Sequence, residues 1–401
     1  MTVSRRHFLA AMAGLAVLPA SARSATHSDA PFALAGTVFT GEDKPPLHDH
    51  AVVVHGTRIV DVVPIHSVNI PRTITVPNAF IMPGVINCHV HGLHSPKERH
   101  ERWLQHGVTA IGDVGSPLKA ISALTQTPTG QTATAACSGP ILCPPGGYPL
   151  PVHDNRYGLV VTSSQHGREQ VRRLADLGAT MIKLAFEPGP NRKPWPMLDA
   201  ATAEAICNQA RRLGLVIRCH VEDIGGLGKV LNAGVDTIEH VPHRWLRNGV
   251  PHPILDRQGL PISPYRKLLD RMVKNGIILT PTQDVLSRSM WSGPELSAPV
   301  QYFNQLNGDI AIGNDFPYRR TEAGMPSKEC TLLQSAGLSN HRILQGATRI
   351  AARACGFKDR GTIRAGNSAD LLLFSGSPLS DLAQLTSPEL IIKDGQRIIP
   401  A

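Results

Sequence analysis

The sequence predicts an α/β protein: a (β/α)₈ TIM barrel with a small β-sandwich formed from both ends of the chain. From Gly84 onward, eight short apolar runs alternate with helix-like segments. Five of these runs carry a histidine, lysine or aspartate that is a candidate for the site. Active sites of barrel enzymes gather at the carboxyl ends of the strands. The pattern therefore predicts both the fold and the face that carries the site.

The predicted barrel strands are bounded by turn residues and separated by candidate helices. One helix is predicted from Asp199, its N-cap, to Leu213, with Gly214 just past the end. A second runs from Asp223 to Asn232, before Gly234. The strands are residues 85–91, 108–114, 132–138, 180–186, 215–221, 236–241, 277–282 and 309–315.

The two ends of the chain lack the alternation of strands and helices seen in the middle. Instead, short β-rich segments alternate there with proline and glycine. Neither end is large enough to form a core alone, so we expect them to pair. This divides the chain into a composite sandwich, residues 26–83 plus 357–401, and a barrel, residues 84–356.

Residues 1–25 have the pattern of a twin-arginine export signal. Arg5 and Arg6 precede an apolar run from Leu9 to Leu18, and Ala20-Ser21-Ala22 resembles a cleavage site. The run is shorter than the roughly 20 residues that span a bilayer. We expect export to the periplasm in folded form, with no stable membrane span after cleavage.

Composition is that of a folded protein, with 42% hydrophobic and 18% charged residues. The net charge of +9 becomes +7 without Arg5 and Arg6. Basic residues are dispersed and only 4% of residues are aromatic, which argues against a nucleic-acid binder. The expected partner is a small-molecule substrate, with some bias toward anions, and a homo-oligomer is compatible with the sequence.

The candidate ligands begin with His89 and His91 in PGVINCHVHG. Alternate strand residues point the same way, so both imidazoles can reach one metal ion. Later strands end near the other candidates, which are Lys183, His220, His240 and Asp315. Four nitrogens and a carboxylate suit zinc first, with manganese, iron or cobalt as alternatives. The simplest account is a hydrolytic site with two divalent metal ions.

Lys183 is the unusual member of this set, because a protonated amine cannot ligate a cation. If it takes up carbon dioxide, the resulting carbamate is an anion that can bridge two metals and help them hold a hydroxide. Alternatively, Lys183 is a buried lysine neutralised by an aspartate or glutamate. The lysine alone leaves both readings open.

The chain resembles the amidohydrolase superfamily, in the group of imidazolonepropionase-like proteins and metallo-dependent Xaa-Pro dipeptidases. PGVINCHVHG is similar to the first-strand motif, and ATRIAARACGFKDRGTIRAGNSADLLLF resembles the closing segment of these enzymes. The resemblance implies that His89 and His91 bind one metal, that His220 and His240 bind the other, and that carbamylated Lys183 bridges them. Asp315 would bind the first metal and move the proton.

Two positions depart from the family pattern: Asn87 stands where aspartate is usual, and Tyr148 where dipeptidase-like relatives often carry histidine. The resemblance implies hydrolysis of a C–N bond in an amide, peptide or cyclic amide by a metal-bridging hydroxide. Two alternatives remain. One is a lactonase or esterase on the same site, and the other is an exported metal-containing binding protein without turnover.

Three long connections, residues 139–165, 242–263 and 283–308, are expected to shape the substrate pocket. Aromatic residues on or near them are candidate pocket walls. These are Tyr148, Trp195, Trp245, Trp291 and Tyr302. Cations that follow two ligand strands are candidates for holding a substrate carboxylate. These are His243, Arg244, Arg319 and Arg320.

Overall fold

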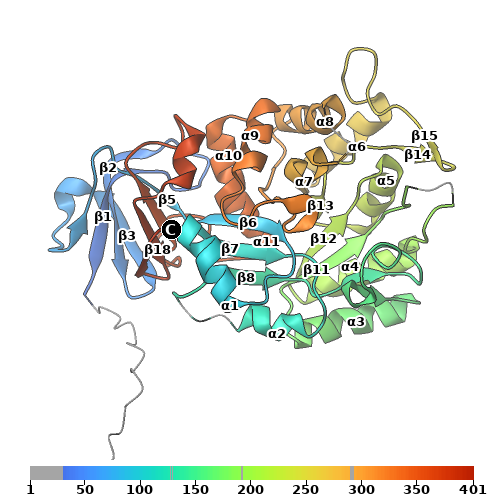
Figure 1. Cartoon of the computed structure of the whole chain (residues 1–401), viewed down its shortest axis with the longest axis horizontal. Coiled ribbons are helices and arrows are strands. Elements are labelled where there is room, and N and C mark those ends of the chain that lie inside the picture. Colours follow the sequence, from blue (N-terminus) through green and yellow to red (C-terminus); the bar gives the residue numbers. More distant parts are fainter. Residues whose placement is uncertain (1–29, 127, 129, 191–192, 290–292) are drawn as a thin grey trace, which may run out of the picture.

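The computed structural model describes residues 30–401 except 127, 129, 191–192 and 290–292. The predicted export segment, residues 1–25, and Trp291 lie outside the described residues. Figure 1 shows a mostly β part at one end of the molecule and a larger part in which helices flank a set of strands. The chain begins in the first part, builds the second and returns to the first.

Strands from both ends of the chain form one eight-stranded sheet, in the order β19-β18-β17-β5-β1-β2-β3 with β4 beside β1. Strand β5 joins the two ends, because it pairs in parallel with β1 and antiparallel with β17. The predicted pairing of the ends is confirmed, and a sandwich of two sheets stays a prediction. The strands are β1 Phe32–Val38, β2 Leu47–His55, β3 Arg58–Pro64, β4 Thr73–Ile74, β5 Phe80–Pro83, β17 Leu371–Phe374, β18 Leu390–Lys393 and β19 Gln396–Ile398.

The larger part has parallel strands in two hydrogen-bonded groups, β6-β7-β8 and β10-β9-β11-β12-β13-β16. Seven of the eight predicted strands are present. The structure adds β9 and β10 inside the predicted loop 139–165, and a small hairpin of β14 and β15. The bounds are β6 Val85–Val90, β7 Val108–Asp113, β8 Thr134–Cys137, β9 Ile141–Cys143, β10 Gly158–Val160, β11 Met181–Ala185, β12 Val216–His220, β13 Thr237–Glu239, β14 Leu246–Arg247, β15 Val250–Pro251 and β16 Ile278–Thr280.

The prediction of an eighth strand at 309–315 is wrong, because this segment forms only isolated bridges. Ile310 pairs with Leu279 of β16, and Phe316 pairs with Val90 of β6. Regular extension fails where Asp315 adopts a left-handed φ of 60°. Gly313 packs so tightly that an added Cβ would lie 2.5 Å from the Cβ of His89. The segment nevertheless lies between β16 and β6, which carries Asp315 to the predicted face.

Helices connect the parallel strands and cover them (Figure 1). The predicted caps are confirmed: Asp199 accepts a hydrogen bond from Thr202 N before α4, and Asp223 from Gly226 N before α5. No described helix is both long and apolar enough to cross a bilayer. The helices are α1 Pro96–Glu98, α2 Ala120–Thr125, α3 Ser164–Asp176, α4 Ala200–Arg212, α5 Ile224–Ala233, α6 Ser263–Lys274, α7 Gln283–Ser287, α8 Pro294–Gln305, α9 Ser327–Ser335, α10 Asn340–Gln345 and α11 Ala351–Cys355.

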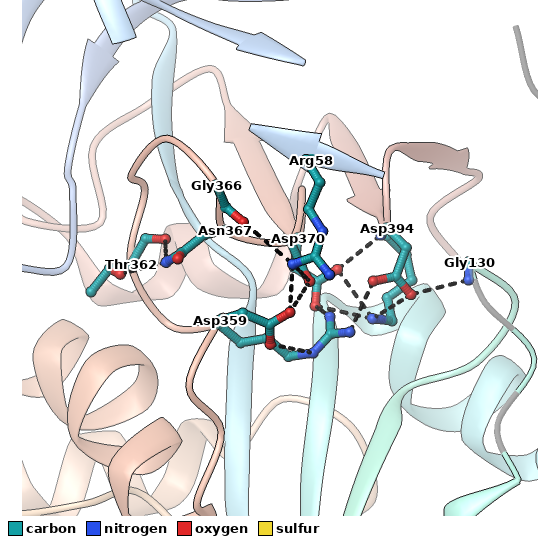
Figure 2. Close-up of polar contacts among 11 residues, drawn as sticks. Arg58, Gly130, Asp359, Thr362, Gly366, Asn367, Asp370 and Asp394 are labelled. Atoms are coloured by element: carbon teal, nitrogen blue, oxygen red, sulfur yellow. Dashed lines mark hydrogen bonds and ion pairs between the residues drawn. The ribbon is translucent and has the colours of Figure 1, made fainter. Parts of the chain in front are cut away.

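A buried ionic network lies in the returning end of the chain and contacts the larger part through a backbone hydrogen bond (Figure 2). Lys393 Nζ at the end of β18 lies 3.0 Å from carboxylate oxygens of both Asp370 and Asp394. Arg360 pairs with the same two carboxylates. Asp394 also accepts a hydrogen bond from the backbone N of Gly130, in the connection between α2 and β8, at 3.1 Å. The returning end of the chain is thus tied to the parallel-strand part by a hydrogen bond between Gly130 and a carboxylate of this network.

Candidate metal centre

The six predicted residues all line one cavity of about 520 Å³ at the carboxyl ends of the parallel strands. His89 belongs to β6 and His91 follows it, whereas Lys183 lies in β11. The other three come from later strands or their ends: His220 from β12, His240 after β13, and Asp315 from the bridging segment. The structure therefore brings together all six candidate ligands. Their role as ligands stays a prediction.

His89, His91 and Asp315 form one compact group of metal-ligating atoms. Asp315 Oδ1 lies 3.4 Å from His89 Nε2 and 3.0 Å from His91 Nε2. This oxygen is buried and, within the described chain, makes no well-aligned hydrogen bond. Ligands of a tetrahedral zinc with bonds of 2.0–2.1 Å are about 3.4 Å apart. The separations of these three atoms therefore match those of ligands around one shared cation.

A second group consists of His220, Glu222 and His240, whose ligating atoms lie within 4.8 Å of one another. His220 Nε2 is buried and has no hydrogen-bond partner among the described residues. Burial holds the pKa of both His220 and His240 well below the ordinary value. Both imidazoles are thus neutral at neutral pH, which is the state that ligates a metal. Glu222 was not predicted as a candidate ligand.

Three of the four histidines are oriented through Nδ1, which leaves Nε2 facing the cavity. His91 Nδ1 lies 3.0 Å from the carbonyl oxygen of Gly115, and His240 Nδ1 lies 2.7 Å from Thr282 Oγ1. His89 Nδ1 lies 2.6 Å from Glu239 Oε2. Such partners fix the ring orientation and tautomer of metal-binding histidines.

Glu239 is the centre of a buried polar cluster that the sequence analysis missed. Its carboxylate accepts two hydrogen bonds from the Arg218 guanidinium, at 2.7 and 2.8 Å, and one from Thr237 Oγ1 at 2.5 Å. Burial favours the neutral acid, but Arg218 and Lys183 hold the pKa of Glu239 well below its usual range. The sequence did contain a signal for this cluster, because Arg218 and Glu239 are charged residues inside the predicted strands 215–221 and 236–241.

Lys183 is fully buried, with 1% of its surface exposed. Burial lowers the pKa of its amine to about 8, against an opposing effect of Glu239. Within the described residues, no carboxylate forms a close ion pair with it. Glu239 and Asp315 nevertheless interact with the amine electrostatically, so the carbamate and the lysine neutralised by an acid both stay predictions. The lowered pKa makes the neutral amine, which is the form that reacts with carbon dioxide, easier to reach than in an exposed lysine.

Seven aromatic and imidazole rings form a closed chain of contacts around the cavity. Tyr148 stacks on His220 with centroids 4.1 Å apart and planes 12° apart. From Tyr148 the contacts continue to His153, Tyr318 and then His91, with successive centroid distances of 5.6, 5.2 and 5.0 Å. The chain of contacts closes through the three histidine pairs His91–His89, His89–His240 and His240–His220, at 5.4, 5.0 and 4.6 Å.

The predicted aromatic walls are only partly correct. Tyr148 and Trp195 line the cavity. Trp245 and Tyr302 are not among its lining residues; Trp245 packs beside His252, and the Tyr302 hydroxyl donates to Asp270 Oδ1 at 3.0 Å. His153 and Tyr318, which the sequence analysis did not single out, take their place.

Of the predicted carboxylate-holding cations, Arg244 and Arg319 line the cavity. Arg244 is already engaged, because its Nη2 lies 2.5 Å from Glu187 Oε1 and 3.0 Å from Glu222 Oε2. Arg319 is exposed at the rim. His243 is buried and Arg320 is exposed, and neither is a lining residue.

Comparison with known families identifies the chain. The model of the Amidohydrolase family matches residues 102–399. The chain belongs to the amidohydrolase family. The match begins after His89 and His91, so the assignment is independent of the first-strand motif. No curated protein matches the chain.

Solved amidohydrolase-like structures share the fold. A Xaa-Pro dipeptidase with bound methionine is 20% identical, with a TM-score of 0.74 over 92% of this chain and 100% of its own. A putative prolidase from Bifidobacterium longum is 24% identical, with a TM-score of 0.72 over 92% and 95%. Ochratoxinase from A. niger is 18% identical, with a TM-score of 0.71 over the same shares. At these identities the likeness concerns the fold.

Proposed function

We propose that this amidohydrolase cleaves a carbon–nitrogen bond in a small amide, peptide or cyclic amide, with two divalent metal ions in the cavity. The observation that carries the proposal is the convergence of His89, His91 and Asp315 with His220 and His240 on one cavity. Membership of the family supports hydrolysis of C–N bonds. Structural neighbours named as Xaa-Pro dipeptidase, ochratoxinase and phenylurea hydrolase are consistent with it.

The residues present fit a pair of zinc ions. His89, His91 and Asp315 would hold the first, and His220 and His240 the second. Lys183 faces the same cavity and, as a carbamate, would be shared by both. When bound, such ions polarise a carbonyl group and lower the pKa of water.

Asp315 is suited to move the proton in this reaction. Burial alone would raise its pKa, but His89 and His91 hold the pKa well below the ordinary value, so the carboxylate is ionised. It can accept a proton from the attacking water and pass it to the leaving nitrogen. The enclosing rings of Tyr148 and Tyr318 reduce the water around the reacting atoms.

The same proposal extends to the architecture and location of the enzyme. We propose that the parallel strands form a (β/α)₈ barrel over 84–356, closed by the segment 309–316 between β16 and β6. The end strands, 26–83 plus 357–401, would form the sandwich. Residues 1–25 would direct twin-arginine export. The mature protein should then begin near Arg23 and be found in the periplasm. Replacing both Arg5 and Arg6 with lysine should block its export.

The test of the function combines turnover with metal content. Asp315→Asn should remain folded and at least partly metallated, and should lose on the order of 10²-fold or more in kcat/KM toward a small amide. Asp176→Asn, an exposed residue at the end of α3, is the matched control. The substrate panel contains N-acyl amino acids, dipeptides and lactones. Wild-type protein should carry about two divalent ions per chain.

Three results would contradict the proposal. Normal turnover by Asp315→Asn would remove the proton role of this residue. Faster cleavage of lactones than of amides would make the enzyme a lactonase. Protein prepared without chelator that holds one ion or none, or electron density for an unmodified Lys183, would remove the binuclear carbamate site.

A further inference from the structure

We propose that Glu222 is a further protein ligand of the second metal position, and that Arg244 holds its carboxylate in place. The inference rests on the proposed metal site but adds a residue that neither the sequence pattern nor the family resemblance assigned. Its starting point is the grouping of His220, Glu222 and His240, whose ligating atoms lie within 4.8 Å of one another.

The backbone around Glu222 is fixed on both sides. Its carbonyl oxygen accepts hydrogen bonds from His243 N at 3.1 Å and Arg244 N at 3.3 Å. The next residue, Asp223, caps α5 and accepts a second bond from Leu246 N at 2.7 Å. These contacts tie the end of β12 to the segment that follows His240. The backbone from which the Glu222 side chain extends is therefore held in place close to His220 and His240.

The carboxylate of Glu222 is also oriented. Arg244 Nη2 donates to its Oε2 at 3.0 Å and lies 2.5 Å from Glu187 Oε1. The side chain of Glu187 is only 2% exposed, so its ion pair holds the Arg244 guanidinium in place from the protein interior. Arg244 contacts Glu222 through one oxygen, and the carboxylate retains lone pairs for a cation. This is the arrangement of a metal ligand supported by an outer partner.

The charges of the two positions also support the assignment. The first position combines two imidazoles with Asp315. Without Glu222, the second position would have two neutral imidazoles and would depend on modified Lys183 for a protein anion. With Glu222, each position has two imidazoles and one carboxylate. The second cation would then be held even when Lys183 is not carbamylated.

Cobalt binding measures the proposal directly, without turnover. Chelator-treated protein is titrated with Co²⁺, and the bound metal is quantified by equilibrium dialysis and visible absorption. Wild-type protein should bind two ions. Glu222→Gln, which keeps the shape and removes the charge, should bind the second ion at least about 10–100-fold more weakly, the loss typical of a supporting partner alone. Glu204→Gln, an exposed residue of α4, is the control for the charge change.

A second variant separates a ligand role from an effect on Lys183. Lys183→Ala should keep measurable binding of the second ion, and the double variant Lys183→Ala/Glu222→Gln should lose it. Circular dichroism verifies that each variant is folded, and Glu222→Asp is used if the glutamine variant is not. Identical Co²⁺ affinity and absorption in wild type and Glu222→Gln would overturn the proposal. Weakened binding in an enzyme that hydrolyses nothing would overturn the hydrolytic function and leave the role of Glu222 standing.

Discussion

His89 Nδ1 and Glu239 Oε2 lie 2.6 Å apart in a fully buried contact between β6 and β13. Because Arg218 keeps Glu239 ionised, the carboxylate can only accept, so His89 carries its hydrogen on Nδ1. The other ring nitrogen is then free for a cation. A contact between two strands thus determines which atom of His89 faces the cavity.

Removing the charge of Glu239 should weaken metal binding without touching a predicted ligand. We expect Glu239→Gln to lower the affinity of the first metal position by about 10–100-fold, because the amide no longer enforces the tautomer of His89. Chelator competition with Zn²⁺ measures the change. The variant also removes the carboxylate charge that pairs with the buried Arg218, so the melting temperature should fall. Unchanged affinity in folded protein would show that the contact is purely structural.

A buried acid outside the cavity should make stability depend on pH. Glu329 in α9 is fully buried, and burial raises its pKa to about 8. The folded state therefore keeps its proton while the unfolded chain, with a pKa of about 4.3, releases it. The free energy of unfolding should fall as pH rises from about 4.5 to 8, by on the order of 3 kcal/mol at pH 7.

The Glu329→Gln variant tests this dependence, because glutamine has no proton to release. Urea denaturation of chelator-treated protein at pH 5 and pH 7.5 should show a smaller loss of stability with rising pH in the variant than in wild type. Glu295→Gln, an exposed residue of α8, is the control. Parallel stability curves for wild type and Glu329→Gln would contradict the raised pKa.

The ionic network of Figure 2 should contribute strongly to stability through Lys393. Lys393 is fully buried and contacts both Asp370 and Asp394. Lys393→Met leaves these two carboxylates with Arg360 as their remaining cation in the network, and loss of one partner from a buried pair typically costs about 3–5 kcal/mol. Chemical denaturation measures the loss. Lys267→Met, on the exposed side of α6, should change stability by less than about 0.5 kcal/mol. Equal effects of the two substitutions would rule out a stabilising role for the network.

Much of the site could be predicted because its signals are local. His89 and His91 share a strand, and His220 and His240 end apolar runs, so their common face follows from strand alternation. Glu239 and Arg218 could not be placed in the same way. Their contact depends on the parallel register of β12 and β13, in which Arg218 pairs with Thr237. The register between two strands about twenty residues apart cannot be predicted from the sequence of either strand alone.

The fold could be predicted in its order of elements but not in its irregular parts. Asp199 and Asp223 cap the expected helices because capping is a short-range interaction. Residues 309–315 have a strand-like sequence, yet tertiary contacts place Asp315 in a left-handed conformation. The short strands β9 and β10 were hidden in a loop rich in proline and glycine. In each case packing overrides the local preference of the residues.

Strand β5 pairs with β1 and with β17, and these two partners are synthesised at very different times. Strand β5 ends at Pro83, and its antiparallel partner β17 begins at Leu371, about 290 residues later. At roughly 5–20 residues per second, the β5 edge waits on the order of 15–60 s on the ribosome for that partner. An unpaired strand edge is open to pairing with other chains throughout this interval. Strand β17 therefore closes this edge late, and a chain that ends before Leu371 keeps the β5 edge open to pairing with other chains.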